Sequence, residues 1–264
     1  MKKLICLFFI FCFLSVTAHE FWLQPDKFIY KKGETANIKF KVGENFEGEN
    51  WSGDKTKVKS LKLYQLNSFS DISSLVSDKK GDSIFLPLQN EGTMVIAYNS
   101  LNSFIKLEPA KFNAYLKEDG LTDAITYRRQ HNETDSTGHE FYQRSVKTII
   151  QVGKQRDSTS NQTTDLPLDI IPLKNPYSLK QGDTLTIKIL FQKKPLVNHK
   201  IRVWQKQKNL LANPELITDK NGEIKFPVSL NGHWMVSTVQ MVHLDNEAKA
   251  NWQSYWGSCT WGYE

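Results

Sequence analysis

Residues 177–191, YSLKQGDTLTIKILF, contain the pattern that decides the fold. After a Gly-Asp turn, the apolar residues Leu185, Ile187 and Ile189 alternate with polar ones, as expected for a strand with one buried face. A similar alternation follows the Asn-Gly turn at 221–222. The second half of the chain therefore predicts a sandwich of short strands joined by tight turns.

The first half of the chain shows the same organisation. Ile38, Phe40 and Val42 alternate with polar residues after a Lys-Gly turn. Short apolar runs follow, separated by Gly, Asn, Asp and Ser. We therefore predict an all-β fold class with two immunoglobulin-like β-sandwich domains.

The predicted domain boundaries follow from composition. Helix-permitting segments interrupt the strand pattern and predict a short helical insertion at about 109–144. Residues 154–165 have no apolar side chain, which is typical of a linker or exposed loop. We expect a first domain at 19–153, a linker at 154–167 and a second domain at 168–264.

Residues 1–18 have the features of a secretory signal peptide. Two lysines precede an apolar run from Leu4 to Leu14, and Val16 and Ala18 are the small residues that signal peptidase requires. The run is too short to span a bilayer, so we expect a soluble, periplasmic or secreted protein after cleavage. Losing the two lysines lowers the formal net charge from +6 to +4. The remaining lysines are scattered, which argues against nucleic acid as a partner.

Cleavage after Ala18 would make His19 the first residue of the mature chain. Its free α-amine and its imidazole would then be able to chelate one metal ion together, which no internal histidine can do. Nitrogen ligands of this kind suit Cu²⁺, Ni²⁺ or Co²⁺. We therefore expect a divalent transition metal at His19, the alternative being that this histidine merely follows the cleavage site. Glu20 is expected to be a solvent-exposed acid, although its carboxylate is a possible further ligand.

Six segments, taken in order along the chain, carry a family resemblance. They are HEFWLQP at 19–25, GENFEG at 43–48, KFNAYLKEDGL at 111–121, EFYQRSVK at 140–147, residues 166–177 and WQSYWGSCT at 252–260. Together they resemble the DUF4198 family, which is described as a NikM-like or Co²⁺ ABC-transport-associated periplasmic component. The resemblance implies a shared fold. It also implies an association with nickel or cobalt uptake, with a transporter in the inner membrane as the partner.

Internal histidines supply further metal candidates. The family commonly has Val-His-Met where this chain has Gln240 at the central position, and His243 lies three residues further on. Strand parity places Gln240 and His243 on opposite faces, so His243 is not a simple substitute. His131 and His139 flank an acidic loop that is able to close over a metal. The alternative is a solvated loop, because the spacing matches no recognised ligand pattern. The metal candidates are therefore His19, His243, His131 and His139.

Three functional hypotheses follow. No catalytic motif is present, so we do not predict an enzyme. The leading hypothesis is an exported protein that handles nickel, cobalt or copper and delivers it to a membrane transporter. One alternative is a metal-independent, immunoglobulin-like module that binds a glycan or a protein partner. The other is a histidine-brace copper enzyme, which requires a second histidine close to His19.

Three further expectations concern the interior. Cys259, the only cysteine outside the signal, is expected to be a buried structural thiol because no base is recognisable nearby. Most tryptophans are expected to pack in the core. Arg144 and Lys147 are expected to fix a buried carboxylate or else to contact a substrate.

Overall fold

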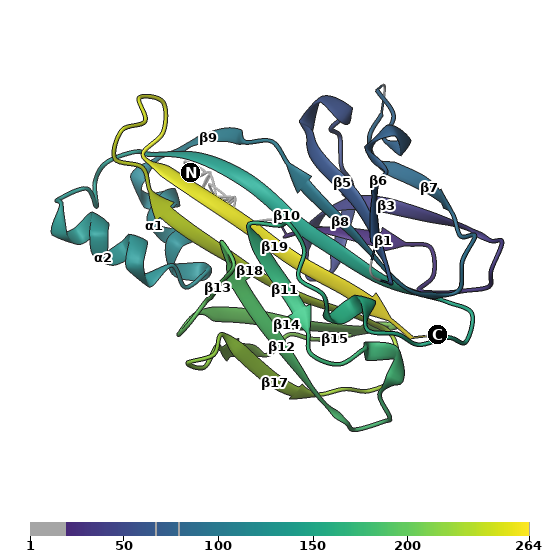
Figure 1. The fold of residues 1–264 in the computed structure, drawn as a ribbon. Coiled ribbons are helices and arrows are strands. Elements are labelled where there is room, and N and C mark those ends of the chain that lie inside the picture. Colours follow the sequence, from purple (N-terminus) through teal and green to yellow (C-terminus); the bar gives the residue numbers. More distant parts are fainter. Residues whose placement is uncertain (1–19, 67, 79, 264) are drawn as a thin grey trace, which may run out of the picture.

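The computed structural model describes residues 20–66, 68–78 and 80–263, and these residues form mainly strands. This confirms the prediction of an all-β sandwich. The long strands β10, β18 and β19 run through the middle of the molecule, with two helices at one end (Figure 1). Within the described residues, no helix combines the length and the apolar character needed to cross a membrane.

The central sheet has 11 strands. Its main path is β15 (Leu210–Ala212), β14 (Lys200–Gln207), β18 (His233–His243), β19 (Trp252–Gly262), β10 (Gly138–Val152), β8 (Gly92–Ser100), β5 (Val58–Gln65) and β6 (Ser68–Asp71). The strands β16 (Glu215–Ile217), β2 (Ile29–Tyr30) and β9 (Ser103–Leu107) pair beside this path.

Two smaller, four-stranded sheets cover the central one. The first contains β1 (Glu20–Pro25), β3 (Thr35–Glu44), β4 (Glu47–Asn50) and β7 (Ser83–Pro87). The second contains β11 (Leu168–Pro172), β12 (Thr184–Phe191), β13 (Lys194–Pro195) and β17 (Glu223–Pro227).

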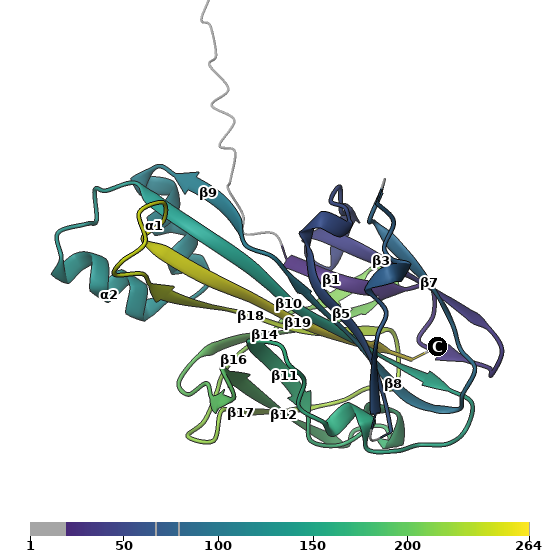
Figure 2. The same cartoon turned by 45° about the horizontal axis from the view of Figure 1, so that its top comes forward.

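The small sheets lie on opposite faces of the central sheet, as strand parity in β8 shows. Met94 and Ile96 belong to the core beneath the first small sheet. Val95 and Ala97, whose side chains point the other way, belong to the core beneath the second. The arrangement is therefore three layers where the sheets overlap (Figure 2). It explains why β8 is buried along its whole length rather than on alternate residues.

The two halves of the chain share the central sheet. β10, from the predicted first domain, pairs in parallel with β19, from the predicted second domain, between Glu140↔Trp252 and Thr148↔Thr260. The sequence pattern suggested two sandwiches joined by a linker at 154–167. In the structure that segment is packed: Thr159 and Ser160 are buried.

The helical insertion is shorter than predicted. It consists of α1 (Pro109–Glu118) and α2 (Thr122–Gln130). The expected end at residue 144 is wrong, because β10 already begins at Gly138 and pairs there with β9. The helices bury their apolar side chains against Val239, Met241 and Trp252 of β18 and β19.

Candidate functional site

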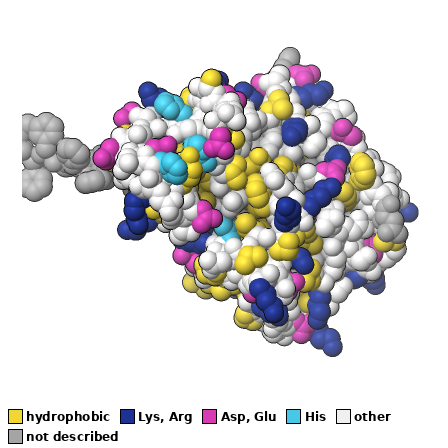
Figure 3. Space-filling model, turned by 60° about the vertical axis from the view of Figure 1, so that its left-hand side comes forward, with side chains coloured by type: hydrophobic (Ala, Val, Ile, Leu, Met, Phe, Trp, Pro, Cys, Tyr) yellow, Lys and Arg dark blue, Asp and Glu magenta, His cyan; other side chains and the backbone are white. Residues whose placement is uncertain are grey.

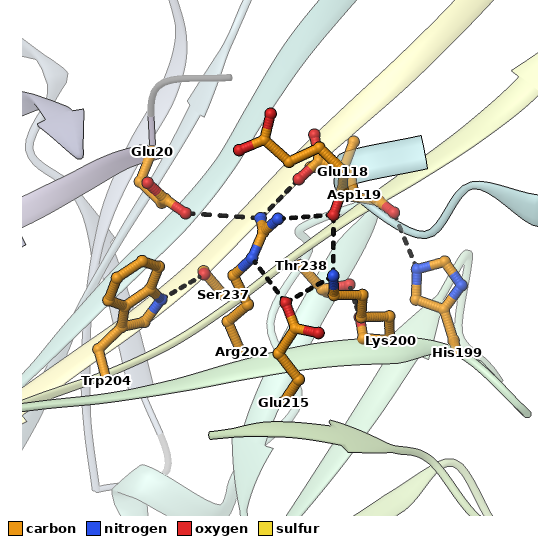
Figure 4. A network of polar contacts seen from close by, with 11 residues as sticks. Glu20, Glu118, Asp119, His199, Lys200, Arg202, Trp204, Glu215, Ser237 and Thr238 are labelled. Atoms are coloured by element: carbon orange, nitrogen blue, oxygen red, sulfur yellow. Dashed lines mark hydrogen bonds and ion pairs between the residues drawn. The ribbon is translucent and has the colours of Figure 1, made fainter. Parts of the chain in front are cut away.

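The start of β1 is fixed by a buried network of charges. Glu20 pairs with Gly43 in the ladder between β1 and β3. Glu20 is 6% exposed, so the expectation of a solvated acid is wrong. Its carboxylate lies 3.6 Å from a guanidinium nitrogen of Arg202 on β14 (Figure 4). The first described residue of the chain is thus held both by the sheet and by an ion pair.

Arg202 also holds the end of helix α1. Its Nη1 donates to Asp119 Oδ1 at 2.5 Å and its Nη2 donates to the carbonyl oxygen of Glu118 at 2.8 Å. Gly120 then turns the chain away with φ +68°, a left-handed conformation that favours glycine. Arg202 therefore links the start of β1 to the end of α1, two points that lie far apart in the sequence.

Two cavity-lining side chains complete the network. Lys200 Nζ lies 2.5 Å from Glu215 Oε1 and donates to the carbonyl oxygen of Glu118 at 2.8 Å. A cavity of about 530 Å³ opens beside these groups. Its lining includes both signs of charge: Glu20, Glu44, Lys117, Glu118, Lys200, Arg202 and Glu215. Glu20, Lys200, Arg202 and Glu215 of this lining are paired with one another.

Burial changes the protonation of the acids in this region. It raises the pKa of Glu20 to about 7, against the opposing effect of Arg202. It likewise raises the pKa of Asp119 to about 6. Asp119 Oδ2 is buried and has no hydrogen-bond partner among the described residues. Both carboxyls are thus able to exchange protons near neutral pH.

Two of the predicted metal candidates meet at the helix end of the molecule. The imidazoles of His131 and His243 stack on the ring of Tyr127, with centroid distances of 3.9 Å and 4.1 Å. His131 Nδ1 lies 2.8 Å from the carbonyl oxygen of Tyr127, and His243 Nδ1 lies 2.9 Å from Asp245 Oδ1. Figure 3 shows histidine and acidic side chains close together on this end.

The other candidates do not join them. His139 stacks on Phe104 at a centroid distance of 6.3 Å. His19 lies outside the described residues. In residues 20–66, 68–78 and 80–263, no group of three or more His, Cys, Asp or Glu side chains has the geometry of a metal site. Two cavities are lined by Glu20, and no described histidine is part of either lining.

The structure resolves the expectations about the interior. Cys259 is fully buried, and burial raises the pKa of its thiol to about 12, which fits a structural role. Lys147 fixes a buried carboxylate, as predicted: its Nζ lies 2.5 Å from Asp169 Oδ1. Arg144 instead packs over the ring of Phe21 at 4.4 Å. Most tryptophans are in the core, as expected: Trp22, Trp234, Trp252 and Trp261.

Arg202, the centre of the network, was not among the residues predicted from the sequence. A usable signal was present, because alternation in 200–204 places Lys200, Arg202 and Trp204 on the face opposite the apolar Ile201 and Val203. An arginine flanked by core residues within a strand favours a buried partner. The partners themselves lie too far away in the sequence for a local pattern to identify them.

The fold and the site define an all-β sandwich protein with a charged cavity at the start of its first strand. A family model described as a domain of unknown function, DUF4198, matches residues 16–242, and the chain belongs to this family. No curated protein matches the sequence.

Similar solved structures show only distant likeness. Dimeric latent PorU from Porphyromonas gingivalis is 9% identical with a TM-score of 0.21, and the match covers 93% of this chain and 20% of that one. Trypsin-activated alpha-2-macroglobulin from Escherichia coli is 9% identical with a TM-score of 0.21, covering 94% of this chain and 16% of that one. The FN1–FN3 domains of chicken CNTN1 are 8% identical with a TM-score of 0.21, covering 90% and 66%. The chain thus spans a fifth or less of the first two proteins.

Proposed function

We propose that this protein is exported and handles a divalent transition metal, nickel, cobalt or copper, as cargo for a membrane transporter. The metal binds at His19, which becomes the first residue of the mature chain when residues 1–18 are removed. The α-amine and the imidazole of one terminal histidine provide two nitrogen ligands on the same residue.

The observation that carries this proposal is the anchoring of Glu20. A chelating terminus gains affinity when its position is fixed before the metal arrives. Glu20 is buried, paired with Gly43 and held by Arg202. Because its carboxylate faces Arg202, we assign Glu20 to anchoring the strand and not to ligating the metal.

The stacked pair His131 and His243 has a secondary part in this proposal. The pair lies at the helix end of the molecule, where the two imidazoles flank the ring of Tyr127, so each offers only a single, weak ligand to a passing metal ion. We expect this pair to change metal affinity far less than His19 does.

The proposal is tested by titrating the mature chain with Ni²⁺, Co²⁺ and Cu²⁺ in a calorimeter. We expect one tight site that is lost in His19→Ala and also in a chain carrying one extra alanine before His19. The extra residue keeps the imidazole but removes the terminal amine from chelation. The double variant His131→Ala/His243→Ala is the matched control and should keep the tight site. Equal affinity in the mature, extended and His19→Ala chains would refute the proposal.

A further inference from the structure

A second and larger cavity lies between the first small sheet and the central sheet. It is a groove of about 910 Å³, within the range of small-molecule binding sites. One wall is the β3–β4 hairpin, and the other is formed by the region around β5, β8, β9 and β10. The hairpin wall adjoins the metal site proposed above, because Gly43, which pairs with Glu20, lines the groove and Glu44 lines both cavities.

The wall on the central sheet is basic, and its main cation is Arg144. The guanidinium carbon lies 4.4 Å from the ring centroid of Phe21 and 5.4 Å from that of Tyr142. The backbone nitrogen of Arg144 donates to Ser100 Oγ at 2.9 Å. Within the part of the chain that the structure describes, Arg144 has no carboxylate partner. A half-buried guanidinium that has no carboxylate partner favours binding of an anionic group from a ligand.

Lys57 belongs to the same wall. The backbone nitrogen of Leu101 donates to the carbonyl oxygen of Lys57 at 2.9 Å, which places Lys57 beside Ser100 and thus on the side of Arg144. Lys57 also has no ion-pair partner in the described ranges. The basic wall therefore presents Arg144, which has no carboxylate beside it among the described residues, and Lys57, which forms no ion pair there but lies close enough to Asp54 to lower the pKa of that acid.

The opposite wall, on the hairpin, is acidic. Glu44, Glu47 and Glu49 line the groove from β3 and β4. Glu47 is paired with Lys206 at 2.7 Å, so its charge is largely balanced. Glu49 is exposed and has no ion pair among the described residues. It is the acid best placed to take a cation from a ligand.

The hairpin wall is held in place by its turn. Asn45 and Phe46 have φ of +54° and +55°, which is the left-handed geometry of a two-residue hairpin turn. Phe46 is nevertheless buried, with its ring 5.5 Å from that of Trp22. Packing of this side chain stabilises a turn that a non-glycine residue rarely adopts, and the turn positions the acidic wall.

We propose that this groove binds a zwitterionic ligand, a short peptide with both ends unblocked. The carboxylate of the ligand pairs with Arg144, assisted by Lys57, and its ammonium group pairs with Glu49. A purely anionic ligand would meet the acids of the hairpin, and a purely cationic ligand would meet Arg144 and Lys57. Only a ligand with separated opposite charges matches both walls.

The test uses the whole mature chain and an equimolar set of unblocked dipeptides with acidic, basic, apolar and polar side chains, read by native mass spectrometry. The best-bound dipeptide is then compared with its N-acetylated and C-amidated forms by calorimetry. We expect each blocked form to bind at least tenfold more weakly. Equal binding of a blocked form, or no dipeptide bound at millimolar concentration, would overturn the proposal.

Two variants test which wall of the groove binds each end of the ligand. Arg144→Gln should abolish the preference for a free carboxylate, and Glu49→Gln should abolish the preference for a free ammonium group. Arg129→Gln and Glu108→Gln, which change exposed residues outside the groove, should keep both preferences. Because Arg144 packs on core rings, its variant is checked for folding by circular dichroism. If Arg144→Gln does not fold, the comparison of blocked and unblocked dipeptides on the unmodified chain still tests the proposal.

Discussion

At the scale of single residues, Arg202 is the group on which the start of the chain depends. It is within ion-pair distance of Glu20 and Asp119, both of which are buried. Neither partner is near it in the sequence, and for this reason sequence analysis placed Glu20 on the surface. Local sequence patterns indicate which residues are apolar. They do not indicate which distant basic residue will pair with a buried acid.

Replacing Arg202 with glutamine should destabilise the protein by about 3 kcal/mol at pH 8, since two buried carboxylates lose their cation. The loss should be smaller at pH 5, because the pKa values of Glu20 and Asp119, about 7 and about 6, allow both groups to take up a proton. Urea unfolding at the two pH values measures this, with Arg129→Gln as the control. An equal loss at both pH values would show that the carboxyls stay charged.

Glu140 gives a second prediction at this scale. It is buried on β10, where its Oε1 accepts from Ser254 Oγ and from Tyr115 at 3.3 Å, and burial raises its pKa to about 7. Because of this raised pKa, Glu140 keeps its proton in the folded state above about pH 4.5, where the unfolded state releases it. The stability from this group is therefore present at low pH and lost as the pH rises through about 7.

Glutamine at this position, Glu140→Gln, cannot lose that proton. The free energy of unfolding of the variant should rise relative to the natural chain by about 2 kcal/mol between pH 5 and pH 8. Urea titrations at both pH values give the difference, and Glu108→Gln, at an exposed site, should show none. A difference that does not change with pH would mean that Glu140 is ionised throughout.

At the scale of elements, the strands follow from alternation, but the β3–β4 turn does not. Asn45-Phe46 is not a standard hairpin signal, and its left-handed backbone is maintained by burial of Phe46. Phe46→Ala should cost about 3 kcal/mol, as is usual for a buried aromatic side chain. Phe85→Ala removes a ring that is 62% exposed and should cost far less. Thermal and urea unfolding compare the two, and equal costs would contradict the role given to Phe46.

The insertion shows a second limit at the element scale. Its helices were predictable from their composition, and Pro109 at the first turn of α1 fits its position. Its end was placed too late because residues 138–144 contain few apolar residues, although they form part of β10. Their polar side chains are satisfied by neighbours, as when Gln143 Nε2 donates to the carbonyl oxygen of Ser100 at 2.8 Å. A buried polar strand lacks the alternation by which strands are recognised.

At the scale of the whole molecule, the two halves are joined through the central sheet. The parallel pairing of β10 with β19 connects residues more than a hundred positions apart, which no local pattern reveals. The buried pair Lys147 and Asp169 strengthens this junction, since it links β10 to β11 of the second small sheet. Asp169 Oδ2 also accepts from the backbone nitrogen of Thr164 at 2.7 Å.

Because of this junction, the chain should unfold in one cooperative transition. Lys147→Met should lower the stability of the whole protein by about 3 kcal/mol by leaving Asp169 charged and buried. Adding Asp169→Asn should restore much of the loss, since asparagine still accepts from Thr164. Calorimetry would contradict this account if it resolved two transitions and only one of them moved in Lys147→Met.

Native mass spectrometry of protein exported with its own signal, offered Ni²⁺, Co²⁺ and Cu²⁺ in competition, would show whether a metal ion binds at His19. We expect a chain that begins at His19 and carries one metal ion, and we expect acetylation of the terminal amine to abolish the adduct. A chain that begins at His19 and remains free of metal, or that keeps its metal after acetylation, would contradict this expectation.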